Sequence, residues 1–163
     1  MSNGFTKDPP ATSGVRMFPP GIYVGALILG YAIEALWPIP IVPDSVSLIV
    51  RIVGLLLLLA GAGFISSAIR LFRRIGTPVN PMEPTTALGF DGPYRFTRNP
   101  MYLGMALVFA GFALLGNALW PLLALIPVIW AIQTQVIAKE EAYLEAKFGT
   151  PYRDFKGRVR RWI

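Results

Sequence analysis

The 163-residue chain contains no cysteine and no histidine. Without cysteine there is no disulfide framework and no thiolate nucleophile. Without histidine, catalysis by an imidazole base is excluded, and the two absences together exclude most zinc and iron sites. We therefore expect no metal centre, and a substrate proton can pass only to water, a carboxylate or a tyrosine.

Charged residues are also scarce, at 15% of the chain, whereas 54% of the residues are hydrophobic. A soluble domain carries about a quarter charged residues, so the composition indicates a membrane protein. A helix needs roughly 20 apolar residues to cross a bilayer core of about 30 Å. The hydrophobic residues gather in four blocks, the third a little short, which we predict to be transmembrane helices at about residues 18–37, 46–72, 100–116 and 119–138.

The fifteen lysines and arginines are distributed unevenly. They precede the first block, lie between the second and third, or follow the fourth, and Arg51 is the exception. Because short loops rich in Lys and Arg stay cytoplasmic, we predict four spans with both termini in the cytoplasm. The basic residues lack interleaved stacking aromatics, which argues against a nucleic-acid partner and favours contact with anionic membrane lipids.

These patterns predict an all-α integral membrane protein with a flexible N-terminal tail at residues 1–17 and one membrane domain at residues 18–163. The tail is polar, and the block after it is long enough to stay in the membrane, so we expect no cleavable signal peptide. The loop at residues 73–99 is long and rich in proline and glycine, and such loops are often functional. We expect this loop and the C-terminal segment, residues 139–163, to enclose a cofactor pocket on the cytoplasmic face.

Small residues recur at the spacing that allows helices to approach closely in a membrane. They form three pairs, for which we predict packing roles: Gly21 with Gly25, Ala26 with Gly30, and Ala106 with Ala110. The first pair would also permit a dimer, so both a monomer and a homodimer stay open.

Two polar clusters should meet at the cytoplasmic ends of the last two spans: residues 92–102, and residues 139–141 with Tyr152 and Arg153 further on. A helix rises about 1.5 Å per residue, so Glu140 lies about 30 Å from the outer turn. This distance returns it to the depth at which the preceding span begins.

Asn99 followed by Pro100 is a favourable helix start, and by itself that is the better interpretation. The free N–H groups of that helix end, with Arg98 beside them, would also bind a carboxylate. Glu140 and Glu141 either form an ordinary charged helix end or receive an ammonium group, and their spacing leaves both interpretations open.

A ligand that carries a carboxylate, an ammonium and a sulfonium would satisfy both clusters, and S-adenosylmethionine is such a ligand. The ring faces of Tyr94 and Tyr102 would suit its sulfonium cation.

The combined pattern resembles a known family. Gly-Pro-Tyr at 92–94, Arg-Asn-Pro-Met-Tyr-Leu-Gly at 98–104 and Glu-Glu at 140–141, followed by Leu144, Phe148-Gly149 and Tyr152, is similar to the isoprenylcysteine carboxyl methyltransferase and phospholipid N-methyltransferase group. The resemblance covers roughly residues 80–160. It implies a methyltransferase that uses S-adenosylmethionine and releases S-adenosylhomocysteine.

The resemblance also implies roles for individual residues. Arg98 and Glu141 would be catalytic residues that orient the cofactor or the substrate. The cofactor contacts would come from Leu88, Gly89, Tyr94, Asn99, Pro100, Met101, Tyr102 and Glu140. The family's bacterial members would place the active site on the cytoplasmic face of the inner membrane.

Two positions depart from the family pattern. Asn99 stands where the family usually has histidine, and an asparagine can still donate a hydrogen bond there. Val136 stands where the eukaryotic prenylcysteine enzymes carry an arginine associated with the substrate. Recognition of a prenylcysteine carboxylate would then fall to Arg95 or Arg98.

We expect methyl transfer to a lipophilic acceptor held in the membrane, either a prenylcysteine-like carboxylate or another isoprenoid or lipid carboxylate. The absence of histidine favours such an acceptor, since a carboxylate needs no base. Three alternatives stay open: a phospholipid N-methyltransferase acting on an ethanolamine headgroup, a nicotinamide-dependent sterol-type reductase, and a non-enzymatic membrane adaptor.

Overall fold

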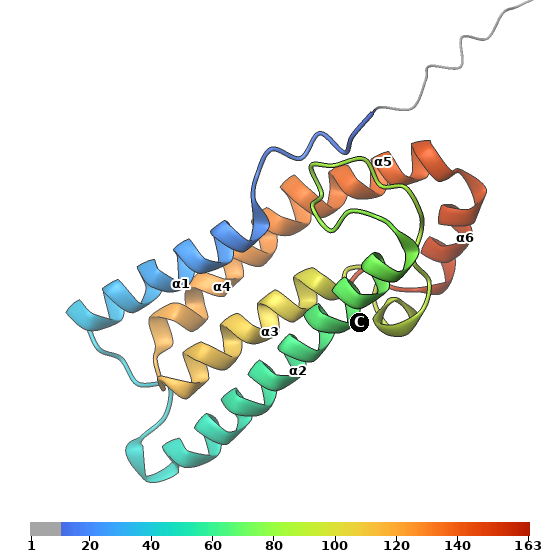
Figure 1. Ribbon diagram of the computed structural model, residues 1–163. Coiled ribbons are helices and arrows are strands. Elements are labelled where there is room, and N and C mark those ends of the chain that lie inside the picture. The colour runs from blue at the N-terminus through green and yellow to red at the C-terminus, as the bar shows by residue number, and fades with distance from the viewer. Residues whose placement is uncertain (1–10) are drawn as a thin grey trace, which may run out of the picture.

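The computed structural model describes residues 11–163, and over this range the chain is helical and contains no β-strand. Residues 1–10 of the predicted N-terminal tail lie outside the described residues. The helices are α1 (Pro19–Leu36), α2 (Ser47–Ile75), α3 (Pro100–Leu115), α4 (Leu119–Ala131), α5 (Ala138–Phe148) and α6 (Thr150–Arg158). A π-helical segment, Ile132–Ile137, joins α4 to α5 (Figure 1).

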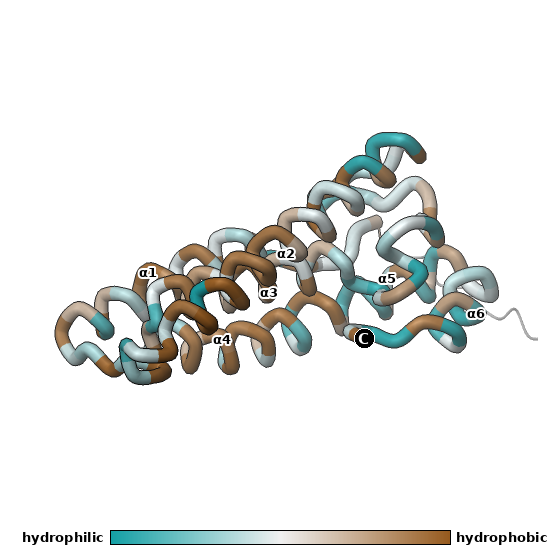
Figure 2. The backbone as a smooth tube through the Cα atoms, turned by 90° about the horizontal axis from the view of Figure 1, so that it is seen from below, coloured by the Kyte–Doolittle hydropathy of each residue, from teal (hydrophilic) through white to brown (hydrophobic). Residues whose placement is uncertain are grey.

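Three helical stretches are long and apolar enough to cross a membrane: Pro19–Leu36, Asp44–Ile75 and Leu119–Phe148. Helix α3 is equally apolar but has only 16 residues. Many large hydrophobic side chains of α1 and α2 point outward and are exposed, which suits contact with lipid chains. Hydrophobic residues dominate α1 to α4, whereas hydrophilic residues gather around α5, α6 and the C-terminus (Figure 2). The chain is therefore an integral membrane protein with one polar end.

Helices α2 and α3 lie side by side and run in opposite directions (Figure 1). Two pairs of glycines hold them together at close range. A Cβ atom on Gly61 would lie 2.5 Å from the Gly104 carbonyl oxygen, and one on Gly54 would lie 2.8 Å from the Gly111 carbonyl oxygen. The missing side chains therefore let the two backbones touch, as small residues do in membrane helix pairs.

Helix α1 packs against α4, where Gly30 meets the backbone of Pro121. The packing role predicted for Gly30 is confirmed. Gly21 and Gly25 pack against no other helix of the described chain, because Gly25 has no neighbour within 4 Å of a Cβ position and Gly21 meets only Phe18. Periodicity alone does not tell a face that packs from a face turned toward lipid.

The end of the molecule opposite the polar end is closed by two connections. The turn between α3 and α4 pairs with the segment after α1: Ile41 N–H donates to the Asn117 carbonyl, and the Asn117 amide exchanges hydrogen bonds with the Val42 backbone. Glu34 of α1 accepts from the N–H groups of Ile39 and Trp120 at 2.7 and 3.1 Å. The acidic residue of the first span thus anchors α1 to the start of α4.

The polar end holds the end of α2, the start of α3, α5, α6 and the loop between α2 and α3 (Figure 1). Helix α2 ends at Gly76, whose φ of +69° is a left-handed conformation suited to glycine. Buried Thr77 follows, and its hydroxyl accepts from the N–H groups of Thr86 and Ala87. These bonds close the base of the loop. The loop folds over the helix ends that carry the other predicted site residues.

Candidate functional site

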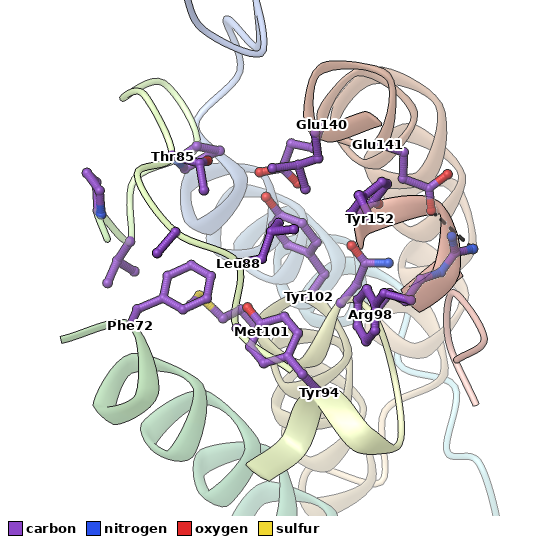
Figure 3. A pocket seen from close by; sticks show the side chains of 18 of the residues that line it. Phe72, Thr85, Leu88, Tyr94, Arg98, Met101, Tyr102, Glu140, Glu141 and Tyr152 are labelled. Carbon is purple, nitrogen blue, oxygen red and sulfur yellow. Dashed lines mark ion pairs between the residues drawn. The ribbon is translucent and has the colours of Figure 1, made fainter. Parts of the chain in front are cut away.

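A pocket opens at the polar end, between the α2–α3 loop, the start of α3, α5 and α6 (Figure 3). Its free internal volume is about 90 Å³. Sites for small molecules typically have about 300–1,000 Å³, so a ligand of that size would require the lining to open. The lining includes nine of the ten predicted site residues: Leu88, Gly89, Tyr94, Arg98, Asn99, Met101, Tyr102, Glu140 and Glu141. Pro100 is the exception, because it is buried in the first turn of α3.

The start of α3 forms one wall of the pocket. Pro100 occupies the first helical position and Asn99 the position before it, as predicted. The Asn99 side chain makes no capping hydrogen bond; its amide instead donates to the Arg161 carbonyl at 2.9 Å. The first N–H groups of α3 therefore receive no side-chain cap from Asn99.

The two glutamates at the start of α5 have different surroundings. Glu140 is partly buried and lines the pocket, and the Tyr102 hydroxyl points toward its carboxylate (Figure 3). Glu141 is buried and bonded to two arginines. Arg98 Nη2 lies 3.3 Å from its Oε1, and Arg161 donates through Nε to Oε1 at 3.0 Å and through Nη2 to Oε2 at 2.6 Å. Of the pair, Glu140 is the one without an arginine partner among the described residues.

Arg98 is the cationic side chain that lines this pocket. Its side chain is 10% exposed, and apart from the Glu141 contact its Nε and Nη1 are buried without a hydrogen-bond partner among residues 11–163. Buried polar groups in native proteins are almost always paired, and an unpaired charged group is costly. The two free donors of Arg98 therefore mark a place for an anionic group.

Aromatic side chains form the rest of the lining. The rings of Phe72 and Tyr94 stack with centroids 5.5 Å apart and an angle of 11° between their planes. Burial raises the pKa of Tyr94, and burial with Glu141 as the next cause raises the pKa of Tyr152. Both phenols are consequently neutral at physiological pH. They offer ring faces and O–H donors to a ligand, and neither supplies a phenolate base.

The departures from the family pattern occupy distinct places. Val136 is fully buried in the helix core. Arg95 is exposed, pairs with Asp91 at 2.9 Å, and does not line the pocket. Of the two arginines considered for a carboxylate, the structure therefore brings only Arg98 to the site.

The sequence predicted that the C-terminal segment helps to enclose the pocket, but it did not predict the contacts of Arg161 and Trp162. Arg161 donates a hydrogen bond to Glu141. Trp162 packs against the helix core, and its Nε1 donates to Gln133 at 2.8 Å. The basic residues of this tail also fit the charge pattern of a cytoplasmic face. That pattern gave no reason to expect specific contacts for any one of them. The pairing of a tryptophan with arginines at the end of a polar segment was the signal available in the sequence.

The family described as phospholipid methyltransferase matches residues 49–151, which is more than half of the chain. The chain belongs to this family of membrane methyltransferases. The matched region contains all ten residues predicted from the resemblance, nine of which line the pocket.

Two relatives are similar over shorter stretches. An uncharacterized protein of Haemophilus influenzae is 48% identical over 65 residues, which are 39% of this chain and all of that protein. The Protein-S-isoprenylcysteine O-methyltransferase of Schizosaccharomyces pombe is 39% identical over 70 residues, which are 42% of this chain but only 29% of that protein. No solved structure matches the chain.

Proposed function

We propose that this protein transfers a methyl group from S-adenosylmethionine to a carboxylate of a lipophilic molecule held in the membrane. The observation that carries the proposal is the pocket at the polar end of an apolar helix bundle, lined by a cation with free donors, Arg98, and a separate carboxylate, Glu140. Molecules with an amino-acid end carry both a carboxylate and an ammonium, and S-adenosylmethionine is one of them.

The residues present fit this cofactor. Arg98 would donate to its carboxylate through a guanidinium nitrogen that is now unpaired, and Glu140 would receive its ammonium. The stacked rings of Phe72 and Tyr94 would face its sulfonium, since aromatic faces attract cations. Leu88 and Met101 supply apolar surface for its base. When bound, the cofactor supplies an electrophilic methyl group.

The acceptor class follows from what the site lacks. A carboxylate oxygen can bond to the methyl carbon while the sulfur–carbon bond breaks and its electron pair stays on sulfur, and no proton has to leave. An ethanolamine nitrogen must first lose a proton. Tyr94 and Tyr152 are neutral donors, and Glu141 is held by two arginines. The residues therefore suit carboxyl methylation, and the Schizosaccharomyces pombe relative, a Protein-S-isoprenylcysteine O-methyltransferase, supports it.

The family description favours a second candidate, N-methylation of a phospholipid headgroup. In that reaction Glu140 could not serve the cofactor's ammonium alone, because it would also have to accept the proton that the amine loses. The same membership gives no support to the nicotinamide-dependent reductase or the adaptor.

Binding of S-adenosylhomocysteine tests the cofactor assignment. Arg98→Ala and Glu140→Gln should each weaken its affinity by at least about tenfold, because a hydrogen bond to a charged group contributes roughly 1.5–3 kcal/mol. Titration calorimetry on the purified protein in detergent measures this. Arg95→Ala and Glu145→Gln are matched controls, since both side chains are paired on the surface outside the pocket, and their affinities should equal that of the wild type.

Unchanged affinity in both Arg98→Ala and Glu140→Gln would contradict the cofactor assignment. Equal losses in the control variants would show a general effect of removing surface charge, and they would contradict the assignment as well.

A further inference from the structure

Residues 159–163, here named the C-terminal strap, lie across the start of α3. Three hydrogen bonds tie the two together: Arg98 N–H donates to the Arg160 carbonyl at 2.9 Å, and the Thr97 hydroxyl and the Asn99 amide both donate to the Arg161 carbonyl, at 3.0 and 2.9 Å. Thr97 is fully buried. The strap is thus fixed by its backbone to the residues on both sides of Arg98.

The Arg161 side chain turns from this anchored backbone to Glu141. It takes both carboxylate oxygens, at 3.0 and 2.6 Å, in the two-pronged arrangement that fixes the plane of a carboxylate. The hydrogen bond to Glu141 raises the pKa of Arg161, so the guanidinium is firmly charged. Arg98 reaches the same carboxylate through one longer contact of 3.3 Å.

Two guanidinium groups around one carboxylate leave one positive charge uncompensated. That charge is on Arg98, whose Nε and Nη1 are buried and without partners in the described chain. A buried carboxylate with Arg98 as its single cationic partner would favour two parallel hydrogen bonds to it. Such a pair would be neutral, and its second hydrogen bond would use an Arg98 nitrogen that is now free.

We propose that Arg161 is a positioning residue: by occupying both oxygens of Glu141 it keeps Arg98 free to donate to the carboxylate of a ligand in the pocket. This inference rests on the proposed function, in which that ligand is the amino-acid end of the methyl-donor cofactor. The C-terminal strap therefore completes the anion site through Glu141 and Arg98, and Arg161 itself need not touch the ligand.

The test compares two ligands that differ only in the carboxylate: S-adenosylhomocysteine and its decarboxylated analogue. In Arg161→Ala, the affinity for S-adenosylhomocysteine should fall at least tenfold, while the affinity for the decarboxylated analogue stays within twofold of the wild type. Titration calorimetry on the full chain in detergent gives both values. Arg161→Lys keeps the charge but can donate to only one oxygen at a time. Its affinity for S-adenosylhomocysteine should therefore fall less than that of Arg161→Ala.

Arg158→Ala is the matched control, because it removes an exposed arginine of the same region that bonds only to the Asp154 carbonyl. It should bind both ligands as the wild type does. If Arg161→Ala does not fold, Arg161→Lys carries the comparison.

A parallel loss for both ligands would mean that Arg161 only stabilises the fold, and no loss for either would mean that it does not act on Arg98; both results overturn the inference. In either case the proposed function stands if the wild type binds S-adenosylhomocysteine and Arg98→Ala does not. A wild type that binds neither ligand would overturn the proposed function and this inference together.

Discussion

At the residue scale, the tightest contacts of the fold depend on side chains that are absent. Gly54 and Gly61 of α2 meet Gly111 and Gly104 of α3, each pair seven residues, or about two turns, from the next. Without a hydrophobic effect between helices in lipid, close backbone approach supplies much of the packing energy. The α2–α3 pair also supports the site, because α3 begins and α2 ends beside the pocket.

Gly61→Ala should therefore destabilise the protein by roughly 1–3 kcal/mol, the usual cost of overpacking a tight contact. The added methyl would lie 2.5 Å from the Gly104 carbonyl oxygen. Gly63→Ala is the matched control on the same helix, since a Cβ there has no neighbour within 4 Å. Thermal unfolding in detergent measures both variants, and equal melting temperatures for the two would contradict this account of the helix pair.

The sequence alone predicted the main residues of the pocket but not all of their contacts. Arg98, Glu140 and Glu141 were predicted because their motifs return to one depth on neighbouring helices, and the structure places all three in one pocket. The sequence could not tell that Glu141 would be held by Arg161, since that contact depends on how the tail folds back. It also could not tell which small residues face a neighbouring helix.

At the element scale, the hydrophobic blocks predicted the helices to within a few residues. The block at residues 46–72 became α2, Ser47–Ile75, and the block at residues 18–37 became α1, Pro19–Leu36. In a membrane, a long apolar segment of this kind satisfies its backbone N–H and C=O groups by forming a helix. The last block differs: it continues through the π-helical segment Ile132–Ile137 into α5, so that one helical stretch carries the glutamates away from the membrane core.

The charge pattern predicts on which side of the membrane each connecting segment lies. The segment before α2 and the end of the chain lie at opposite ends of the molecule (Figure 1). Because the chain has no cysteine, a single introduced cysteine is a unique label. In intact cells, Ser45→Cys should react with a membrane-impermeant maleimide, and Arg153→Cys should react only after the membrane is opened. Both positions are exposed. Labelling of the two positions from the same side would contradict a four-span arrangement.

At the scale of the whole molecule, an apolar helix bundle and a polar end divide two tasks. Hydrophobic surfaces of α1 and α2 face lipid, while the pocket lies among the hydrophilic elements (Figure 2). A lipophilic acceptor would reach the pocket from the membrane and a polar cofactor from water. This division explains why a methyltransferase with so small a chain would be built into a bilayer.

One measurement tests the central claim most directly. Purified protein is incubated with S-adenosylmethionine carrying a tritiated methyl group and a total lipid extract, and the organic phase is then treated with mild alkali. A methyl ester releases labelled methanol under these conditions, whereas an N-methyl group is stable. We predict lipid-phase label that alkali releases, and its loss in Arg98→Ala. Label that resists alkali would contradict the carboxylate acceptor, and a lipid phase without label would contradict methyl transfer to a membrane lipid.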